Sequence, residues 1–109
     1  MPDSDKAMYL IQLLLPIHSN NKEKFPAEYF AEVRRDLTSR FGGVTAFLRS
    51  PAEGLWKEGE EGVQRDEVVM FEVMTKELDK KWWADYRTAL ERRFSQQELL
   101  FWAMNVTRL

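Results

Sequence analysis

Cysteine is absent from this sequence of 109 residues, and histidine occurs only once, at His18. Without cysteine the chain can form no disulfide, offers no thiol nucleophile and has no thiolate ligand for a metal. One histidine and no cysteine also argue against a zinc or copper site. Acidic residues are plentiful, but none follows the spacing of a calcium-binding loop. We therefore expect neither a metal nor a cofactor.

Long apolar runs are missing as well. The longest run lies between Met8 and Ile17, well short of the roughly 20 apolar residues that span a membrane. Acidic residues and a single lysine precede this run, whereas a signal peptide has a basic start and a small-residue cleavage site. The sequence thus predicts a soluble, cytoplasmic protein that does not bind a membrane.

Neither sign of charge dominates, because 16 basic residues face 18 acidic ones for a net charge of −2. Such a chain has no overall positive field to hold a nucleic acid. The segment "KKWWADYR" (80–87) does mix basic and aromatic residues, as surfaces that bind single strands do. Helical spacing, however, places Trp83 and Tyr86 on a core-facing side. We expect no nucleic-acid partner.

The length suits one domain over residues 1–109. Residues 1–6 are expected to be a disordered or extended N-terminus, and residues 50–64 a protruding hairpin arm. Aromatic residues make up 13% of the chain. On a small chain this indicates either a dense core or an apolar surface that needs a partner.

Hydrophobic periodicity and turn residues predict four strands and two helices. The strands are expected at 7–17, 44–50, 63–74 and 96–109, and the helices at 25–43 and 76–94. The helices share one spacing: Phe30, Val33, Leu37 and Phe41 form one apolar face, and Trp83, Tyr86, Leu90 and Phe94 form the other. Each face therefore predicts a helix packed on a sheet.

The two halves of the chain also match at an offset of 53 residues, as Leu37 with Leu90 and Phe41 with Phe94 illustrate. A tandem repeat and the order β-α-β-β-α-β predict an α+β, ferredoxin-like fold. Right-handed crossovers give a four-stranded antiparallel sheet in the order 4-1-3-2, with both helices on one face.

Both faces of three predicted strands are apolar, although a sheet with helices on one side normally alternates. No third helix is predicted that could cover the second face. We therefore expect a second copy to cover it, in a symmetric homodimer whose sheets pack face to face. The residues expected in this interface are Leu10, Leu14, Met70, Met74, Trp102 and Met104.

The element order and the doubly apolar sheet resemble the dimeric α+β barrel proteins. That group includes cofactor-free monooxygenases of antibiotic biosynthesis, muconolactone-isomerase-like proteins and stress-responsive barrel proteins. The resemblance covers the whole chain but includes no catalytic motif. It implies a homodimer, and an enzyme of this kind would be a cofactor-free monooxygenase or an isomerase.

The segment "GGVTAF…GLWKE…VQRDEVVMFEV" resembles an uncharacterised family of small proteins more closely. Its pattern is Gly-Gly-X-Thr, then Gly-X-Trp, then Arg-X-Glu before the third strand. The matching residues are Gly42, Gly43, Thr45, Gly54, Trp56, Arg65 and Glu67. Some members of that family are exported, whereas no export signal is predicted for this chain. The resemblance implies the fold and no activity.

Trp56 stands alone in the polar segment "SPAEGLWKEGEEG" (50–62). It either covers the backbone and cross-strand neighbours of its own hairpin, or it contacts another protomer or closes a pocket. Since an isolated two-stranded hairpin is marginal in water, we expect Trp56 to be buried by the partner protomer.

Polar residues near the apolar faces are the candidates for binding a ligand. Gln12, Thr45 and Glu72 are expected to point into a cavity between the two sheets. A second group, Arg49, Arg65 and Glu67, could hold a substrate carboxylate or could simply form a surface ion pair. His18 is a weak candidate for a general base, since no triad spacing accompanies it.

Two classes of function fit these features. The first is a protein that binds a small apolar molecule, in a cavity between sheet and helices or between two sheets, with or without catalysis. The second is a structural or regulatory dimer that has no ligand. A polar-lined cavity would distinguish the first class from the second.

Overall fold

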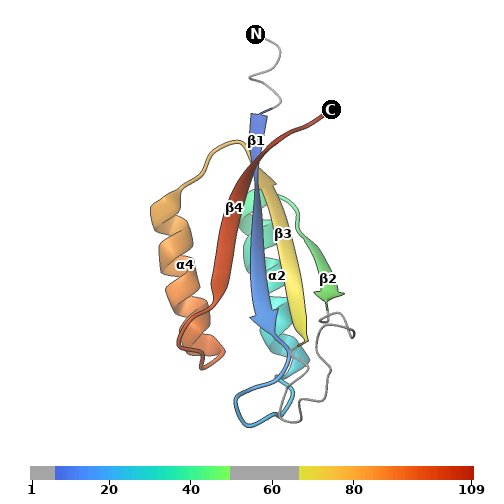
Figure 1. Ribbon diagram of the computed structural model, residues 1–109, viewed down its shortest axis with the longest axis vertical. Coiled ribbons are helices and arrows are strands. Elements are labelled where there is room, and N and C mark those ends of the chain that lie inside the picture. The colour runs from blue at the N-terminus through green and yellow to red at the C-terminus, as the bar shows by residue number, and fades with distance from the viewer. Residues whose placement is uncertain (1–6, 50–66) are drawn as a thin grey trace, which may run out of the picture.

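The computed structural model describes residues 7–49 and 67–109, with residues 47–49 described by their backbone alone. The elements follow one another as β1, α2, β2, β3, α4 and β4 (Figure 1). Their bounds are Ala7–Pro16 for β1, Ala27–Phe41 for α2, Thr45–Arg49 for β2, Val68–Thr75 for β3, Lys80–Arg93 for α4 and Leu100–Thr107 for β4. The α+β class and the predicted order of elements are confirmed.

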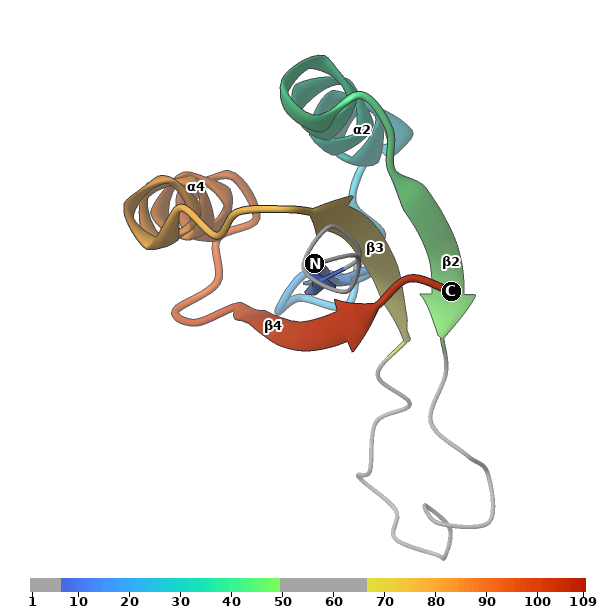
Figure 2. The same cartoon turned by 90° about the horizontal axis from the view of Figure 1, so that it is seen from above.

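The four strands form one antiparallel sheet in the order β2-β3-β1-β4. This is the predicted order 4-1-3-2 read from the opposite edge. Both helices lie on the same side of the sheet (Figure 2). The arrangement is that of a ferredoxin-like fold, with β1 and β3 in the middle of the sheet and β2 and β4 at its edges.

Local backbone structure and capping explain where α2 begins and ends and where α4 begins. Helix α2 follows Pro26, whose extended backbone and missing N–H suit the position before the first turn. It ends at Gly42, which has a φ of 85° and donates its backbone N–H to the carbonyl of Thr38. Helix α4 follows Asp79, whose side chain accepts a hydrogen bond from the backbone N–H of Trp82.

The core lies between the helices and the sheet, and the predicted helix faces form it. Leu37 and Leu90, which correspond to each other in the repeat, are both fully buried. They pack with apolar residues of β1 and β3 in one continuous cluster. The buried members are Ile11, Leu13, Leu15, Val33, Leu37, Phe71, Val73, Trp83, Leu90, Phe94 and Leu99. Because these side chains fill the layer between sheet and helices, a ligand cavity there is not supported.

The aromatic part of "KKWWADYR" packs between the helices, as expected from its spacing. Trp83 is 7% exposed, and its ring stacks on Phe41 of α2 at 5.2 Å between centroids. The Arg40 guanidinium lies 4.4 Å from the ring centroid of Trp82, a cation–π contact within the chain. These aromatic rings therefore serve the fold and do not form an open stacking surface.

Several predicted boundaries were too wide. Strand β4 begins at Leu100 rather than residue 96. The described part of β3 begins at Val68, and the predicted residues 63–66 lie outside the described residues. Helix α4 begins after its Asp79 cap, four residues later than predicted. Sequence patterns place boundaries poorly because turns and caps at an element's end carry little hydrophobic signal.

The predicted hairpin arm, together with Trp56 and Arg65, lies outside the described residues. Within the described ranges, no helix is long and apolar enough to cross a membrane.

Candidate functional site

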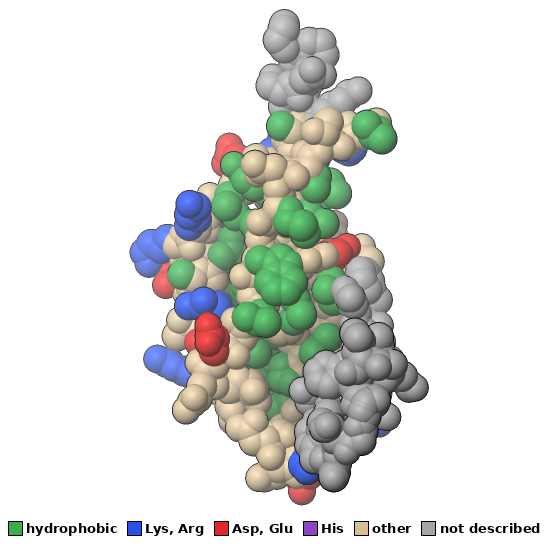
Figure 3. All heavy atoms as spheres, in the orientation of Figure 1, with side chains coloured by type: hydrophobic (Ala, Val, Ile, Leu, Met, Phe, Trp, Pro, Cys, Tyr) green, Lys and Arg blue, Asp and Glu red, His purple; other side chains and the backbone are tan. Residues whose placement is uncertain are grey.

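The sheet face opposite the helices, here called the outer face, carries an unusual amount of exposed apolar surface. Met74, Leu100, Trp102 and Met104 are 41–51% exposed. Figure 3 shows hydrophobic side chains gathered over the middle of this face. Contiguous apolar surface of this kind marks a binding site in most soluble proteins.

One polar row crosses the middle of the outer face. The strand register places Thr45 opposite Glu72, Glu72 opposite Gln12, and Gln12 opposite Trp102. One residue of each strand therefore contributes to the row, in the spatial order of the strands. The register thus places Gln12, Thr45 and Glu72 on one face of the sheet, and the cavity between two sheets into which they are expected to point stays a prediction.

Hydrogen bonds connect three members of the polar row. The Gln12 amide donates from Nε2 to Oε2 of Glu72 at 2.6 Å. The Trp102 indole Nε1–H donates in turn to the Gln12 amide oxygen. Since Gln12 uses both its amide oxygen and its nitrogen, its orientation is fixed. Among the described residues only Gln12 donates to the Glu72 carboxylate, which can accept further hydrogen bonds on the side away from the core.

Apolar rows flank the polar row on both sides. On one side Leu10 of β1 lies between Met74 and Met104. On the other side Leu14 of β1 lies between Met70 and Leu100. The outer face is therefore an apolar surface that surrounds one hydrogen-bonded polar row.

The outer face differs from the prediction at one residue. Met70, which the sequence places in the interface, is only 2% exposed in the single chain and offers little surface to a partner. It lies on the inner strand β3, between Leu14 and the backbone position of Phe47 on β2. Leu10 and Leu14 are half-buried, so the open part of this face belongs mainly to β4 and to the end of β3.

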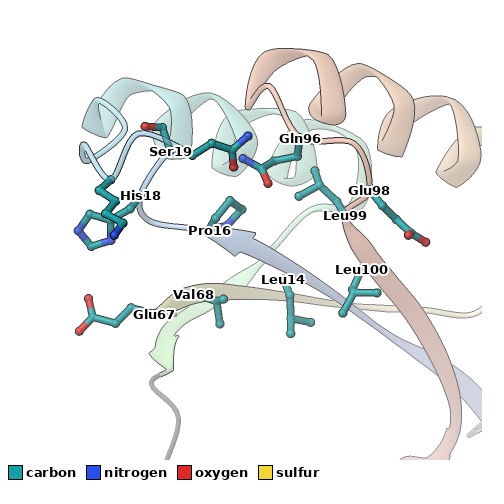
Figure 4. Close-up of a pocket in the computed structure, with 12 residues that line it drawn as sticks. Leu14, Pro16, His18, Ser19, Glu67, Val68, Gln96, Glu98, Leu99 and Leu100 are labelled. Atoms are coloured by element: carbon teal, nitrogen blue, oxygen red, sulfur yellow. The ribbon is translucent and has the colours of Figure 1, made fainter. Parts of the chain in front are cut away.

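His18 and Glu67 lie at the end of the sheet and not beside the polar row. Both line an open pocket of about 660 Å³, here called the end pocket. Figure 4 shows apolar side chains of β1, β3 and β4 in this pocket, with Glu67 and Glu98 on opposite sides. The backbone of Arg49 pairs with Val68 near the same end. The structure thus separates the predicted residues into two groups, one in the middle of the sheet and one at its end.

Two well-anchored loops build the end pocket. Between β1 and α2, the backbone of Ser19 bonds with Glu23 and Lys22, and its hydroxyl accepts from two further backbone N–H groups. Between α4 and β4, the Glu91 carboxylate accepts the backbone N–H of Leu99 at 3.0 Å. Because these bonds hold both loops, the pocket has a defined shape without a ligand.

A third polar cluster connects the two helices. The Tyr86 hydroxyl donates to Asp36 at 2.9 Å, and Arg93 pairs with both Asp36 and Glu32. Burial, followed by the hydrogen bond to Asp36, raises the pKa of Tyr86. Since this cluster lies between packed helices, it holds α2 and α4 together and presents no open site.

Sequence reasoning missed two contributors to these sites. Trp102 was assigned to the interface, but its indole N–H also completes the polar row, which only the strand register reveals. The loop residues of the end pocket, among them Lys22, Gln96 and Glu98, had no periodic signal. Among the described residues, no group of three or more acidic, histidine or cysteine side chains could hold a metal.

No protein-family model matches the sequence, and no curated protein matches it. Among solved structures, a phage SAM lyase in complex with S-methyl-5′-thioadenosine has a similar fold, with a TM-score of 0.56. The two chains are 11% identical, and the match covers 93% of this chain and 90% of the lyase. This likeness shows the α+β fold and carries no activity over to this chain.

Proposed function

We propose that the protein is a homodimer that binds a small, mostly apolar molecule between two outer faces. One observation carries the proposal: the outer face is apolar and exposed, and a single hydrogen-bonded polar row crosses it. In this arrangement Glu72, Gln12 and Trp102 supply the polar contacts to the ligand, and the methionine and leucine side chains surround its apolar part.

A second copy is the occupant that best fits the outer face. Two identical twisted sheets can pack face to face about a two-fold axis, and each then covers the other's apolar rows. The charge of the chain is nearly balanced, so two copies do not repel each other strongly. The resemblance to dimeric α+β barrels supports the same arrangement.

The polar row supports a ligand within that interface. Covering the outer face would remove water from the Glu72 carboxylate, and burying a carboxylate without a partner costs several kcal/mol. Gln12 supplies one donor only. A ligand that carries a hydroxyl, an amine or an N–H group would supply the missing donor and would explain why the row is polar.

A further question is whether the protein catalyses a reaction of the molecule that it binds. If the bound molecule reacts, the resemblance to the dimeric α+β barrels implies a cofactor-free oxygenation or isomerisation, with Glu72 as the nearest proton acceptor. The alternative is a structural or regulatory dimer without a ligand. The cytoplasmic location expected from the sequence stays a prediction.

Native mass spectrometry of freshly purified protein tests the proposal. We expect twice the chain mass plus a retained small molecule, which denaturing mass spectrometry then identifies after release. S-methyl-5′-thioadenosine, the ligand named with the structurally similar lyase, should be among the compounds added back. A dimer without any retained or added ligand would favour the structural alternative, and a monomer would contradict the proposal.

A further inference from the structure

We propose that the free edge of strand β4 pairs antiparallel with the same edge of a second copy, so that two four-stranded sheets join into one. This contact uses the backbone N–H and C=O groups of the edge, whereas the proposed dimer uses side chains of the outer face. The inference therefore does not require the proposed function, and both contacts can exist together.

Strand β4 lies at one margin of the sheet (Figure 2), and no described strand pairs with its other edge. It pairs with β1 in an unbroken register, from Ala7 with Thr107 to Leu14 with Leu100. In an antiparallel strand, alternate residues direct their N–H and C=O groups away from the paired neighbour. Among the described residues, no backbone bond outside this pairing involves residues 100–107. The groups on the free edge are therefore available to another strand.

The sequence of β4 has none of the usual protections of a sheet edge. Natural edge strands are commonly short, carry a charged residue or a proline, or contain a bulge. Strand β4, "LFWAMNVT", has 8 residues without a charge, a proline or a glycine, and none of them is buried. The other edge strand, β2, has 5 residues and ends in Arg49, and Pro51 follows in the sequence. Since the same sheet protects one edge and not the other, β4 is the edge that fits a partner strand.

The residues around β4 favour a second copy as that strand. Pairing about a two-fold axis at Ala103 places Trp102 opposite Met104 of the second copy, a favourable contact of sulfur with an aromatic ring. The same register places Glu98 opposite Arg108 of the second copy, once at each end of the paired strands. Both residues are exposed, and the Glu98 carboxylate points away from the end pocket (Figure 4). Among the described residues neither belongs to an ion pair, so each is available to stabilise this register.

This register also keeps the helices of both copies on one side of the joined sheet. Facing residues of paired strands lie on the same side, and side chains alternate along each strand. Pairing about Ala103 therefore joins the two outer faces into one continuous apolar surface. A shift by one residue would place the helices of the two copies on opposite sides. Because a contact between two edges is small, we expect it to form at a higher chain concentration than the face-to-face dimer.

Hydrogen exchange of backbone amides tests the pairing directly. We expect alternate amides of residues 100–107 to exchange roughly tenfold more slowly at millimolar than at micromolar chain concentration, because bonding to a second strand protects them. Face-to-face packing leaves the edge amides open to water, so this measurement separates the edge contact from the proposed dimer. Protection that is independent of concentration would mean that the same chain covers the edge, and absence of protection would mean that the edge stays open. Either result would overturn the inference.

A single introduced thiol reports the geometry, because the chain has no cysteine. Ala103→Cys places two thiols opposite each other at the two-fold axis, where the Cβ atoms of facing residues are close enough for a disulfide. We expect it to form a linked dimer roughly tenfold faster than Ala89→Cys, the same change at an exposed position of α4. Adding Met74→Gln, which alters only the outer face, should leave the linking rate unchanged. Equal rates for the two cysteine variants would contradict the pairing.

Reversing charges tests the register. In the Ala103→Cys background, Glu98→Lys should slow linking roughly three- to tenfold, because like charges then face each other at both ends. Adding Arg108→Glu should restore the rate, since the opposite charges are then exchanged between the copies. Glu77→Lys changes an exposed carboxylate beyond the end of β3 and should have no effect. A combined variant that links no faster than Glu98→Lys alone would exclude pairing about Ala103.

Discussion

Replacing Met74 and Met104 together by glutamine should separate the proposed dimer while it leaves each subunit folded. The two residues flank Leu10 in one apolar row and are 47% and 41% exposed. Glutamine keeps the length and flexibility of methionine but replaces the thioether with an amide that prefers water. Because both side chains already face outward, the core is untouched.

The expected loss of dimer stability can be worked out from the exposed fractions of the two methionine side chains. Fully burying a methionine side chain contributes about 1.5–3 kcal/mol, so the exposed 47% and 41% amount to about 1.3–2.6 kcal/mol in one subunit. A symmetric interface contains each residue twice, which gives about 2.6–5.2 kcal/mol per dimer. This is an upper bound, since it supposes complete burial, and it corresponds to a dissociation constant roughly 80- to several thousand-fold higher.

Sedimentation velocity over a concentration series measures this change. Leu109→Gln is a matched control, because Leu109 is a fully exposed apolar residue that follows the end of β4. We expect the control to associate like the parent and the double variant to sediment as a monomer with unchanged far-UV circular dichroism. A double variant that associates as tightly as the parent would refute the outer face as the interface.

Three further predictions address the polar row, the core and the helix pair. Glu72→Gln should lower the dissociation constant of the ligand-free dimer more than tenfold, because a charge no longer has to be desolvated, and it should reduce ligand retention. Sedimentation measures the first effect and native mass spectrometry the second. A weaker dimer would contradict the role of Glu72. Leu90→Ala should cost about 2–5 kcal/mol in urea unfolding because Leu90 is fully buried, whereas exposed Thr88→Ala on the same helix should stay within about 0.5 kcal/mol. Burial and the hydrogen bond to Asp36 raise the pKa of Tyr86 in the folded state. The contribution of Tyr86 to the free energy of unfolding is therefore complete below the ordinary tyrosine pKa of 10.0, and it declines as the pH rises above that value. Alkaline unfolding of Tyr86→Phe should therefore depend less steeply on pH, and an unchanged slope would argue against this linkage.

The fold could be predicted from the sequence because its signals are local and repeated. The helix faces around Leu37 and Leu90 have the same spacing, and burial of both residues follows from that spacing. Strand order required only the rule that crossovers are right-handed and connections short. These features depend on periodicity, which a single sequence displays directly.

The sites could be predicted only in part, because they depend on register. Alternation along a strand shows that Gln12 and Glu72 avoid the core, but it does not show that they pair with each other and with Trp102. The end pocket depends on two loops that hydrogen bonds hold in place, such as the bond that the Glu91 carboxylate accepts from the backbone N–H of Leu99, eight positions further along the chain. No periodic pattern marks such a bond.

If the outer face is an interface, as proposed, the polar row bears on whether that interface binds a ligand or serves association alone. A dimer without a ligand would be more stable with apolar residues at positions 12 and 72, since a buried polar pair seldom repays its desolvation. A buried polar group can fix the register of an interface. The hydrogen bond from Trp102 to the neutral amide of Gln12 would be enough to fix that register. The Glu72 carboxylate adds a desolvation cost that register alone does not require, and a donor on a bound molecule offsets this cost. The charge at position 72 is therefore the feature that favours a ligand between the sheets over an empty interface.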